Sequence, residues 1–259
     1  MSKSQSAESI FLGNLGVQST QRFTDRAFRS YGDADHLVEL AEKWRNVAKD
    51  KAQGHLFEQL EVSKFNLDAL RQDSELFAKT TASMGFPTDP VDIVIKKGDS
   101  LVREVQAKSC NSAARSAFAL SQEKYDEMAR LAPQDQHEKI KELLEQRISK
   151  GTLKAADYEK TYRNLQTSLQ QDNVQSSGTT YQEALDHTDI ETAKKTANSI
   201  KRDAALADMH GSAKQAGLAG AGISGGVSAT ANVYNSIVQF LMLDQSPKVE
   251  LCAHAALAW

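Results

Sequence analysis

Residues 91–108 alternate apolar and polar side chains with a period of two, whereas the long segments on either side repeat every three to four residues. Two runs rich in β-branched residues, 91–95 and 101–108, are separated by the turn sequence Lys97-Gly98-Asp99-Ser100. This change of period predicts an antiparallel β-hairpin set among helices.

The apolar pattern also selects the register of this hairpin, because a slip by one residue exchanges its two faces. A three-residue loop at 98–100 places Ile93 opposite Val105 and gathers the apolar side chains on one face. A two-residue loop would place Ile93 opposite Glu104 and mix apolar and polar side chains on both faces. We therefore expect the three-residue loop.

In this register the second face carries Asp92 opposite Gln106, with Glu104 and Lys108 beside them. The Cβ atoms of opposed residues lie about 4.5–5.5 Å apart. Carboxylate and amide oxygens suit Mg²⁺, which uses one or two protein carboxylates together with waters and phosphate oxygens. A lysine on the same face can orient or deprotonate a metal-bound water, or stabilise charge that develops on phosphorus. This face is therefore a candidate hydrolytic site.

The runs Pro90-Val91-Asp92-Ile93-Val94 and Glu104-Val105-Gln106-Ala107-Lys108 resemble the PD-(D/E)xK nuclease superfamily. In that family a helix carrying a glutamate precedes the hairpin and another helix follows it. Here Glu58 and the segment from Ala113 stand in those places, so the resemblance covers roughly residues 40–130. The chain differs in having Gln106 where the family usually has a carboxylate, and in having Val91 between the Pro and the Asp.

The resemblance implies a restriction-endonuclease-like core, which is an α/β fold with a small mixed sheet flanked by helices. It implies that Asp92 is the central metal ligand, that Gln106 or Glu104 takes the second ligand position, and that Lys108 is the catalytic lysine. Glu58 would be the acid on the helix and a further metal ligand. The implied activity is phosphodiester hydrolysis with Mg²⁺ or Mn²⁺ on nucleic acid, with DNA favoured over RNA.

Helical periodicity predicts the other elements. The expected helices include an apolar stripe at 37–44, His55–Phe77 with a break near Asn66, 113–131 and 136–148, and a capping box at Thr180-Tyr181-Gln182-Glu183 opens another. The polar, aperiodic segment 170–180 is expected to be a linker. It would join a nuclease-like α/β domain at 1–169 to an α-helical, Ala/Gly-rich segment at 181–259.

The C-terminal segment is rich in small residues. Ala or Gly recurs every four residues from 213 to 229, and Gly222 with Gly226 forms a GxxxG pair, so one helix face would carry almost no side chains. The 29 positions of 215–243 contain no charge, which is long enough to cross a bilayer as a helix. Membrane contact, a tightly packed helix and a homo-oligomer contact all remain open for this segment.

The N-terminal sequence has only the short apolar run Ile10-Phe11-Leu12, so no secretory signal is evident. We expect a cytoplasmic protein, with inner-membrane association through 215–243 as an alternative. In architecture, a nuclease with such a tail resembles bacterial effector or toxin proteins and phage-defence proteins.

Charge and cysteine content exclude several classes of protein. With 31 Lys and Arg against 34 Asp and Glu, the net charge is −3, so a nucleic-acid surface must be local. The two cysteines, Cys110 and Cys252, exclude a disulfide scaffold and a Cys-rich zinc module. Two rival interpretations remain: a non-enzymatic helical interaction or membrane-associated protein whose hairpin has an ordinary charged outer face, and a catalytically inactive fold that binds nucleic acid.

Overall fold

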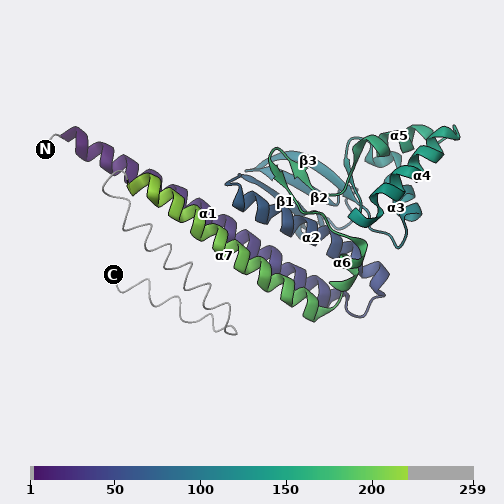
Figure 1. Ribbon diagram of the computed structural model, residues 1–259, viewed down its shortest axis with the longest axis horizontal. Helices are drawn as coiled ribbons and strands as arrows, with labels where there is room; N and C mark the ends of the chain where they lie inside the picture. Colours follow the sequence, from purple (N-terminus) through teal and green to yellow (C-terminus); the bar gives the residue numbers. More distant parts are fainter. Residues whose placement is uncertain (1–2, 221–259) are drawn as a thin grey trace. The chain divides into compact units, whose positions relative to one another are not determined.

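The computed structural model describes residues 3–220 and divides the chain into two compact units (Figure 1). One unit comprises residues 28–200, and the other comprises residues 1–27 with 201–259. The larger unit is a mixed α/β structure with a five-stranded sheet, which confirms the predicted fold class at this coarse level. The Ala/Gly-rich positions beyond 220, including Gly222 and Gly226, lie outside the described residues.

The sheet is mixed in direction. Its order is β1-β2-β3-β4-β5, with antiparallel pairing from β1 to β3 and parallel pairing from β3 to β5. The strands are β1 Leu76–Thr80, β2 Ile93–Lys97, β3 Ser100–Ala107, β4 Ala129–Leu131 and β5 Leu165–Gln166.

The hairpin of β2 and β3 has the predicted register where it matters for the site. Ile93 pairs with Val105, which confirms the choice made from the apolar pattern. Beyond Ile95 the register shifts, and Lys96 pairs with Leu101, so the turn has two residues and not the expected three. Gly98 (φ 58°) accommodates the tighter turn, and a bulge at Val102 restores the register.

Helix α2, Lys49–Arg71, covers the apolar face of this sheet. Leu56, Phe57, Leu60 and Phe65 pack with Ile93, Ile95 and Val105 in the main core. The break expected near Asn66 does not occur, because the Asn66 side chain bonds both the N–H and the C=O of Ala78 on the edge strand β1, at 2.7 and 3.0 Å. The helix also ends earlier than predicted, and Phe77 belongs to β1.

The predicted helix 113–131 is three elements. Helix α3 spans Ala113–Leu120, a 3-10 turn η2 spans Glu123–Tyr125, and β4 then joins the sheet. After the turn η3, Gln134–Gln136, helix α4 spans His137–Ser149, in agreement with the prediction, and α5 spans Ala155–Asn164. A second core lies among α3, α4 and α5, around Leu120, Ile140, Leu144 and Tyr158.

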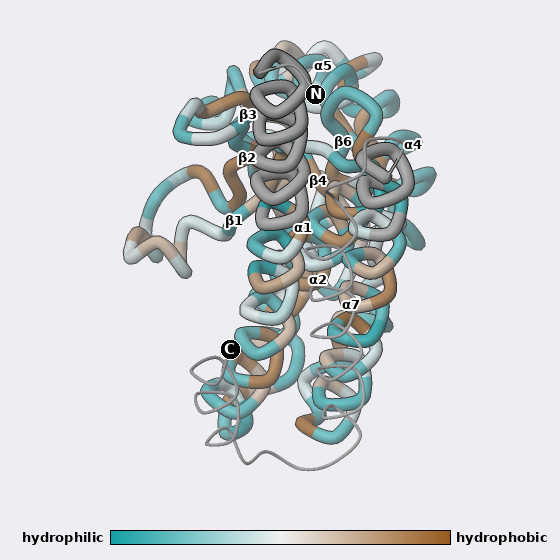
Figure 2. The backbone as a smooth tube through the Cα atoms, turned by 90° about the vertical axis from the view of Figure 1, so that its left-hand side faces the viewer, coloured by the Kyte–Doolittle hydropathy of each residue, from teal (hydrophilic) through white to brown (hydrophobic). Residues whose placement is uncertain are grey.

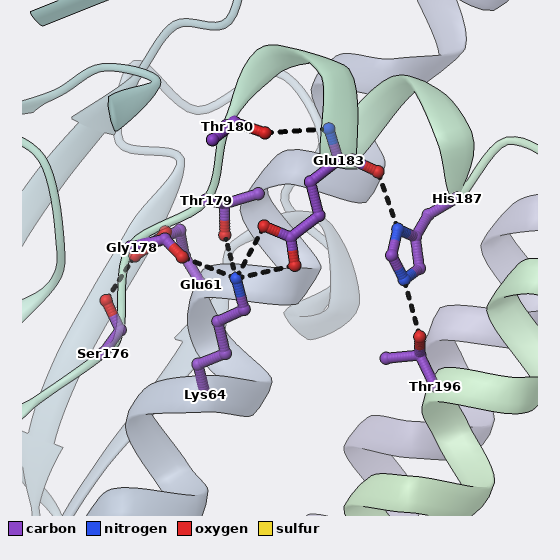
Figure 3. Close-up of polar contacts among 9 residues, drawn as sticks. All are labelled: Glu61, Lys64, Ser176, Gly178, Thr179, Thr180, Glu183, His187 and Thr196. Atoms are coloured by element: carbon purple, nitrogen blue, oxygen red, sulfur yellow. Dashed lines mark hydrogen bonds and ion pairs between the residues drawn. The ribbon is translucent and has the colours of Figure 1, made fainter. Parts of the chain in front are cut away.

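The segment 170–180, expected to be a linker, contains the short strands β6 Gln170–Gln171 and β7 Val174–Gln175. It is held against α2 by polar contacts (Figure 3). The Glu61 carboxylate accepts hydrogen bonds from Ser176 Oγ and from the Leu169 amide, and burial raises the pKa of Glu61. The exposed fraction of Val174 and of Thr179 is 0%, so this polar segment is part of the packed unit.

Lys64 completes this attachment. Its Nζ donates to the Gly178 carbonyl and Thr179 Oγ1 and lies 2.9 Å from the Glu183 carboxylate (Figure 3). Glu183 lies on α6, Tyr181–Asp186, and its amide donates at 2.9 Å to the hydroxyl oxygen of Thr180, the N-cap of this helix. The helix predicted from the capping box therefore begins where expected.

Helices α1, Lys3–Trp44, and α7, Ile190–Gly220, run through both units. In the larger unit they contribute mainly small side chains to the core: Ala34, Leu37, Ala41, Ala193, Ala197 and Ile200. Figure 2 shows hydrophobic residues, in brown, recurring along the strands and helices between hydrophilic segments in teal. None of the helices within 3–220 is long and apolar enough to cross a membrane.

Candidate functional site

The Asp92 carboxylate lies where β2 begins and β3 ends. The Asp92 amide donates to Val105 O at 3.1 Å, and its carbonyl accepts from the Thr81 amide at 2.9 Å, so the backbone on both sides is fixed. One oxygen, Oδ2, accepts from the Ala107 amide at 3.0 Å and from the Gln106 side-chain nitrogen. The sequence-predicted juxtaposition of Asp92 and Gln106 is present in the structure.

Lys108 donates to the same oxygen. Its Nζ lies 2.8 Å from Asp92 Oδ2, and the side chains of the two residues are 29% and 18% exposed. The Lys108 amide donates a hydrogen bond to Leu131 O on β4 at 3.0 Å, which fixes the backbone position of Lys108. Burial alone would lower the pKa of Lys108, but the contact with Asp92 outweighs it and raises that pKa. Lys108 is therefore a cation at neutral pH.

Glu58 on α2 completes the cluster. Its carboxyl group is partly buried, and burial together with repulsion from Asp92 raises the pKa of Glu58 well above its usual value, with Lys108 opposing the shift. Two carboxyl groups that repel each other in this way form a site that a divalent cation would stabilise, because the cation neutralises both.

Gln106 has an unsatisfied oxygen. Its side chain is 1% exposed, and within the described part of the chain Oε1 is buried with no hydrogen-bond partner. A buried acceptor without a donor costs about 1–3 kcal/mol. A cation or a cation-bound water would satisfy this oxygen, so the unpaired atom fits the expected Mg²⁺ site.

The donor set is small. Within residues 3–220 no three His, Cys, Asp or Glu side chains converge as ligands. Asp92, Glu58 and the Gln106 amide would supply two carboxylates and one neutral oxygen. Mg²⁺ suits such a set, because it keeps several waters and takes further oxygens from substrate phosphates.

Glu104 does not join this cluster. It pairs with Val94, a register step farther from the end of the strand. The structure records no hydrogen bond or ion pair from the Glu104 carboxylate to any of the described site residues. The structure thus joins Asp92, Gln106 and Lys108 by direct contacts, whereas Glu58 interacts with Asp92 and Lys108 through its charge, and Glu104 shows neither kind of interaction with the described site residues.

Several residues near the cluster carried weaker sequence signals. His55, one helical turn before Glu58, stacks on Trp44 with ring centroids 4.6 Å apart, and its charge interacts with those of Asp92 and Lys108. Burial, followed by repulsion from Lys43, lowers the pKa of His55. The i, i+3 spacing of His55 and Glu58 was the available signal.

Gln53, a further residue of α2, forms hydrogen bonds with Ser109, the residue after Lys108. Its side chain is buried, its nitrogen donates to Ser109 O, and its oxygen accepts from Ser109 Oγ at 2.7 Å. No sequence pattern pointed to this pair, because the two residues are far apart in the chain.

Comparison with known proteins adds no family to this description. No protein-family model, curated protein or solved structure matches the chain. The fold and the cluster define a mixed α/β protein with a carboxylate, amide and ammonium site at one end of its sheet.

Proposed function

We propose that this protein is a metal-dependent nuclease that hydrolyses phosphodiester bonds, with DNA as the favoured substrate. The observation that carries the proposal is the shared oxygen Asp92 Oδ2. Gln106 in β3 and Lys108 just after β3 both donate to it, and the buried Gln106 Oε1 has no described partner.

The order of the elements supports the restriction-endonuclease-like core that the sequence resemblance implies. Helix α2 carries Glu58 and precedes the hairpin, Asp92 immediately precedes β2, Lys108 immediately follows β3, and α3 comes next. We propose that these elements are the catalytic core, with residues outside 28–200 serving delivery, membrane contact or oligomer formation.

The acidic and amide side chains would bind the cation, and the lysine would interact with the phosphate. Asp92, Glu58 and Gln106 Oε1 would hold the cation, which when bound supplies an activated water and neutralises phosphate charge. Lys108, whose pKa the contact with Asp92 raises against the opposing effect of burial, would stabilise negative charge on the attacked phosphate as a cation. Asp92 holds that ammonium in place at 2.8 Å.

The test is cleavage by the purified full-length chain. Single-stranded DNA, double-stranded DNA and RNA are each incubated with Mg²⁺, with Mn²⁺ and with EDTA. The proposal expects cleavage that depends on the cation and is abolished by Asp92→Asn. Binding without cleavage under all conditions would favour an inactive nucleic-acid-binding fold, and neither binding nor cleavage would favour the non-enzymatic interpretation.

A further inference from the structure

Tyr125 lies among three cations beside the proposed site. Its ring centroid is 5.9 Å from Lys108 Nζ, 4.9 Å from Lys124 Nζ and 5.4 Å from Arg130 Cζ. The residue is only 5% exposed and packs with Val91, which adjoins Asp92. An aromatic face attracts cations at such distances, most strongly where water is excluded.

Arg130 reaches this ring from the strand next to the site. Strands β3 and β4 run parallel, with Arg130 in register with Gln106, so both side chains leave the same face of the sheet. Arg130 is 1% exposed and is the largest of the fully buried side chains described. The sequence analysis placed Arg130 in a predicted helix, 113–131, whereas the structure places it in β4.

Arg130 contacts Tyr125 in two ways, and its charge also interacts with Asp126 and Asp157. Its Nη1 donates to the carbonyl oxygen of Tyr125, and its guanidinium lies over the ring of the same tyrosine. Among the described residues, its Nε is buried without a hydrogen-bond partner. A buried guanidinium is costly to desolvate, so its attachment to both the backbone and the ring of Tyr125 indicates a specific role for that tyrosine.

We propose that Tyr125 and Arg130 are positioning residues for Lys108, with Arg130 fixing the tyrosine and the tyrosine ring holding the ammonium over Asp92. The inference rests on the proposed nuclease function and deepens it. Neither residue would touch the substrate. Asp92 fixes the Lys108 ammonium from one direction at 2.8 Å, and the ring restricts its remaining freedom.

A rival explanation is that Tyr125 only fills the small apolar cluster with Val91, Val94 and Met128. Tyr158 provides a matched control for that explanation. It is 8% exposed, belongs to the second core, and has Arg147 Cζ 5.2 Å from its ring centroid. Loss of this ring removes a comparable apolar and cation–π contact in a core cluster separate from that of Tyr125.

The experiment compares Tyr125→Leu, Tyr125→Phe, Arg130→Lys and Tyr158→Leu in the full chain with Mg²⁺ and DNA. Tyr125→Leu is expected to lower kcat about five- to thirtyfold with KM within twofold, the range of a partly desolvated cation–π contact. Tyr125→Phe retains the ring and restores kcat to within about twofold of the wild type. Tyr158→Leu lowers the melting temperature and leaves kcat unchanged. Equal kcat values for Tyr125→Leu and Tyr158→Leu would overturn the proposal.

A second readout is independent of catalysis. Acylation of Lys108 by an amine-reactive reagent, followed by peptide mass spectrometry, measures how firmly the ammonium is held. Tyr125→Leu should raise this labelling severalfold, and Tyr125→Phe should not. An inactive wild type would refute the nuclease function, while unchanged labelling would refute the positioning role. If Tyr125→Leu does not fold, Arg130→Lys, which loses the Nη1 hydrogen bond to Tyr125 O and the guanidinium contact with the ring, should lower kcat and raise the labelling of Lys108, and no change in either would overturn the proposal.

Discussion

Gln106 donates from its side-chain nitrogen to the Asp92 carboxylate, while its own oxygen is buried without a partner among the described residues. The Gln106 amide therefore satisfies the Asp92 carboxylate, while its own oxygen lacks a donor within residues 3–220. A glutamate at this position would place a negative charge where the unpaired amide oxygen of Gln106 lies.

Gln106→Glu should bind Mg²⁺ more tightly. Unit charges a few ångströms apart near a protein surface attract each other by up to several kcal/mol. A second carboxylate beside Asp92 should therefore strengthen the binding of a divalent cation and lower Kd about tenfold or more. Isothermal titration calorimetry of the two proteins measures this directly, with the exposed Gln175→Glu as the control. An unchanged Kd would remove Gln106 from the metal site.

Glu58→Gln should stabilise the protein at neutral pH in metal-free buffer. The pKa of Glu58 is raised in the folded state, mainly by burial and then by Asp92, so its contribution to stability is lost as pH rises above the ordinary value of 4.5. The variant removes this loss, and its advantage should grow with pH. Urea unfolding from pH 5 to pH 8 tests the slope, with Glu104→Gln as the matched control. A larger advantage at pH 5 than at pH 8 would contradict the account.

Asp33→Asn should have a similar effect, with burial again the main cause. Burial raises the pKa of Asp33 from 3.8 to about 6, although Asn66 Nδ2 donates to its carboxylate at 2.7 Å. Stability should therefore fall by on the order of 3 kcal/mol between pH 4 and pH 7. An asparagine keeps the acceptor without the charge, so the two proteins should differ little at pH 4 and clearly at pH 7. Equal unfolding free energies at pH 7 would refute this, and Asp99→Asn in the hairpin turn is the control.

Lys64→Met should loosen the segment 170–180 from α2. The variant loses the hydrogen bonds to Gly178 O and Thr179 Oγ1 and the ion pair with Glu183, and we expect a loss of about 1–2 kcal/mol because the lysine is 21% exposed. Lys139→Met removes an exposed ion pair with Glu142 and should cost less than about 0.5 kcal/mol. Equal losses in chemical denaturation would mean that the segment is held by its apolar contacts alone.

The hairpin and its register were predictable because one face of two adjacent strands is apolar and period two separates the faces. Ile93 and Val105 have no comparable alternative pairing, so the positions of Asp92 and Gln106 followed from them. The turn was not predictable to the residue, because a bulge at Val102 allowed a shorter loop with the same register at the site.

Strands β1 and β4 of the main sheet were missed for physical reasons. Strand β1 directly follows α2, and Leu76 and Phe77 continue the apolar spacing of the helix. Strand β4 has only three residues, all buried, so it shows no alternation, and its central residue is Arg130. Such a strand is recognisable only from the neighbours that bury it.

The segment 170–180 was mistaken for a linker because its residues are small and polar. Ser176 and Thr179 are nevertheless buried, since Glu61 and Lys64 on α2 supply their hydrogen-bond partners. A sequence pattern based on apolar spacing cannot detect a segment that packs through polar contacts.

The role of Lys108 is the most direct test of the account. Cleavage of DNA by the purified chain in Mg²⁺ should be measured for the wild type, for Lys108→Met and for Lys97→Met, whose lysine is exposed at the other end of the hairpin. The account predicts that the wild type and Lys97→Met cleave at similar rates and that Lys108→Met is slower by about a hundredfold or more. A folded Lys108→Met that cleaves as fast as the wild type, or a wild type that cleaves nothing with Mg²⁺ or Mn²⁺, would contradict it.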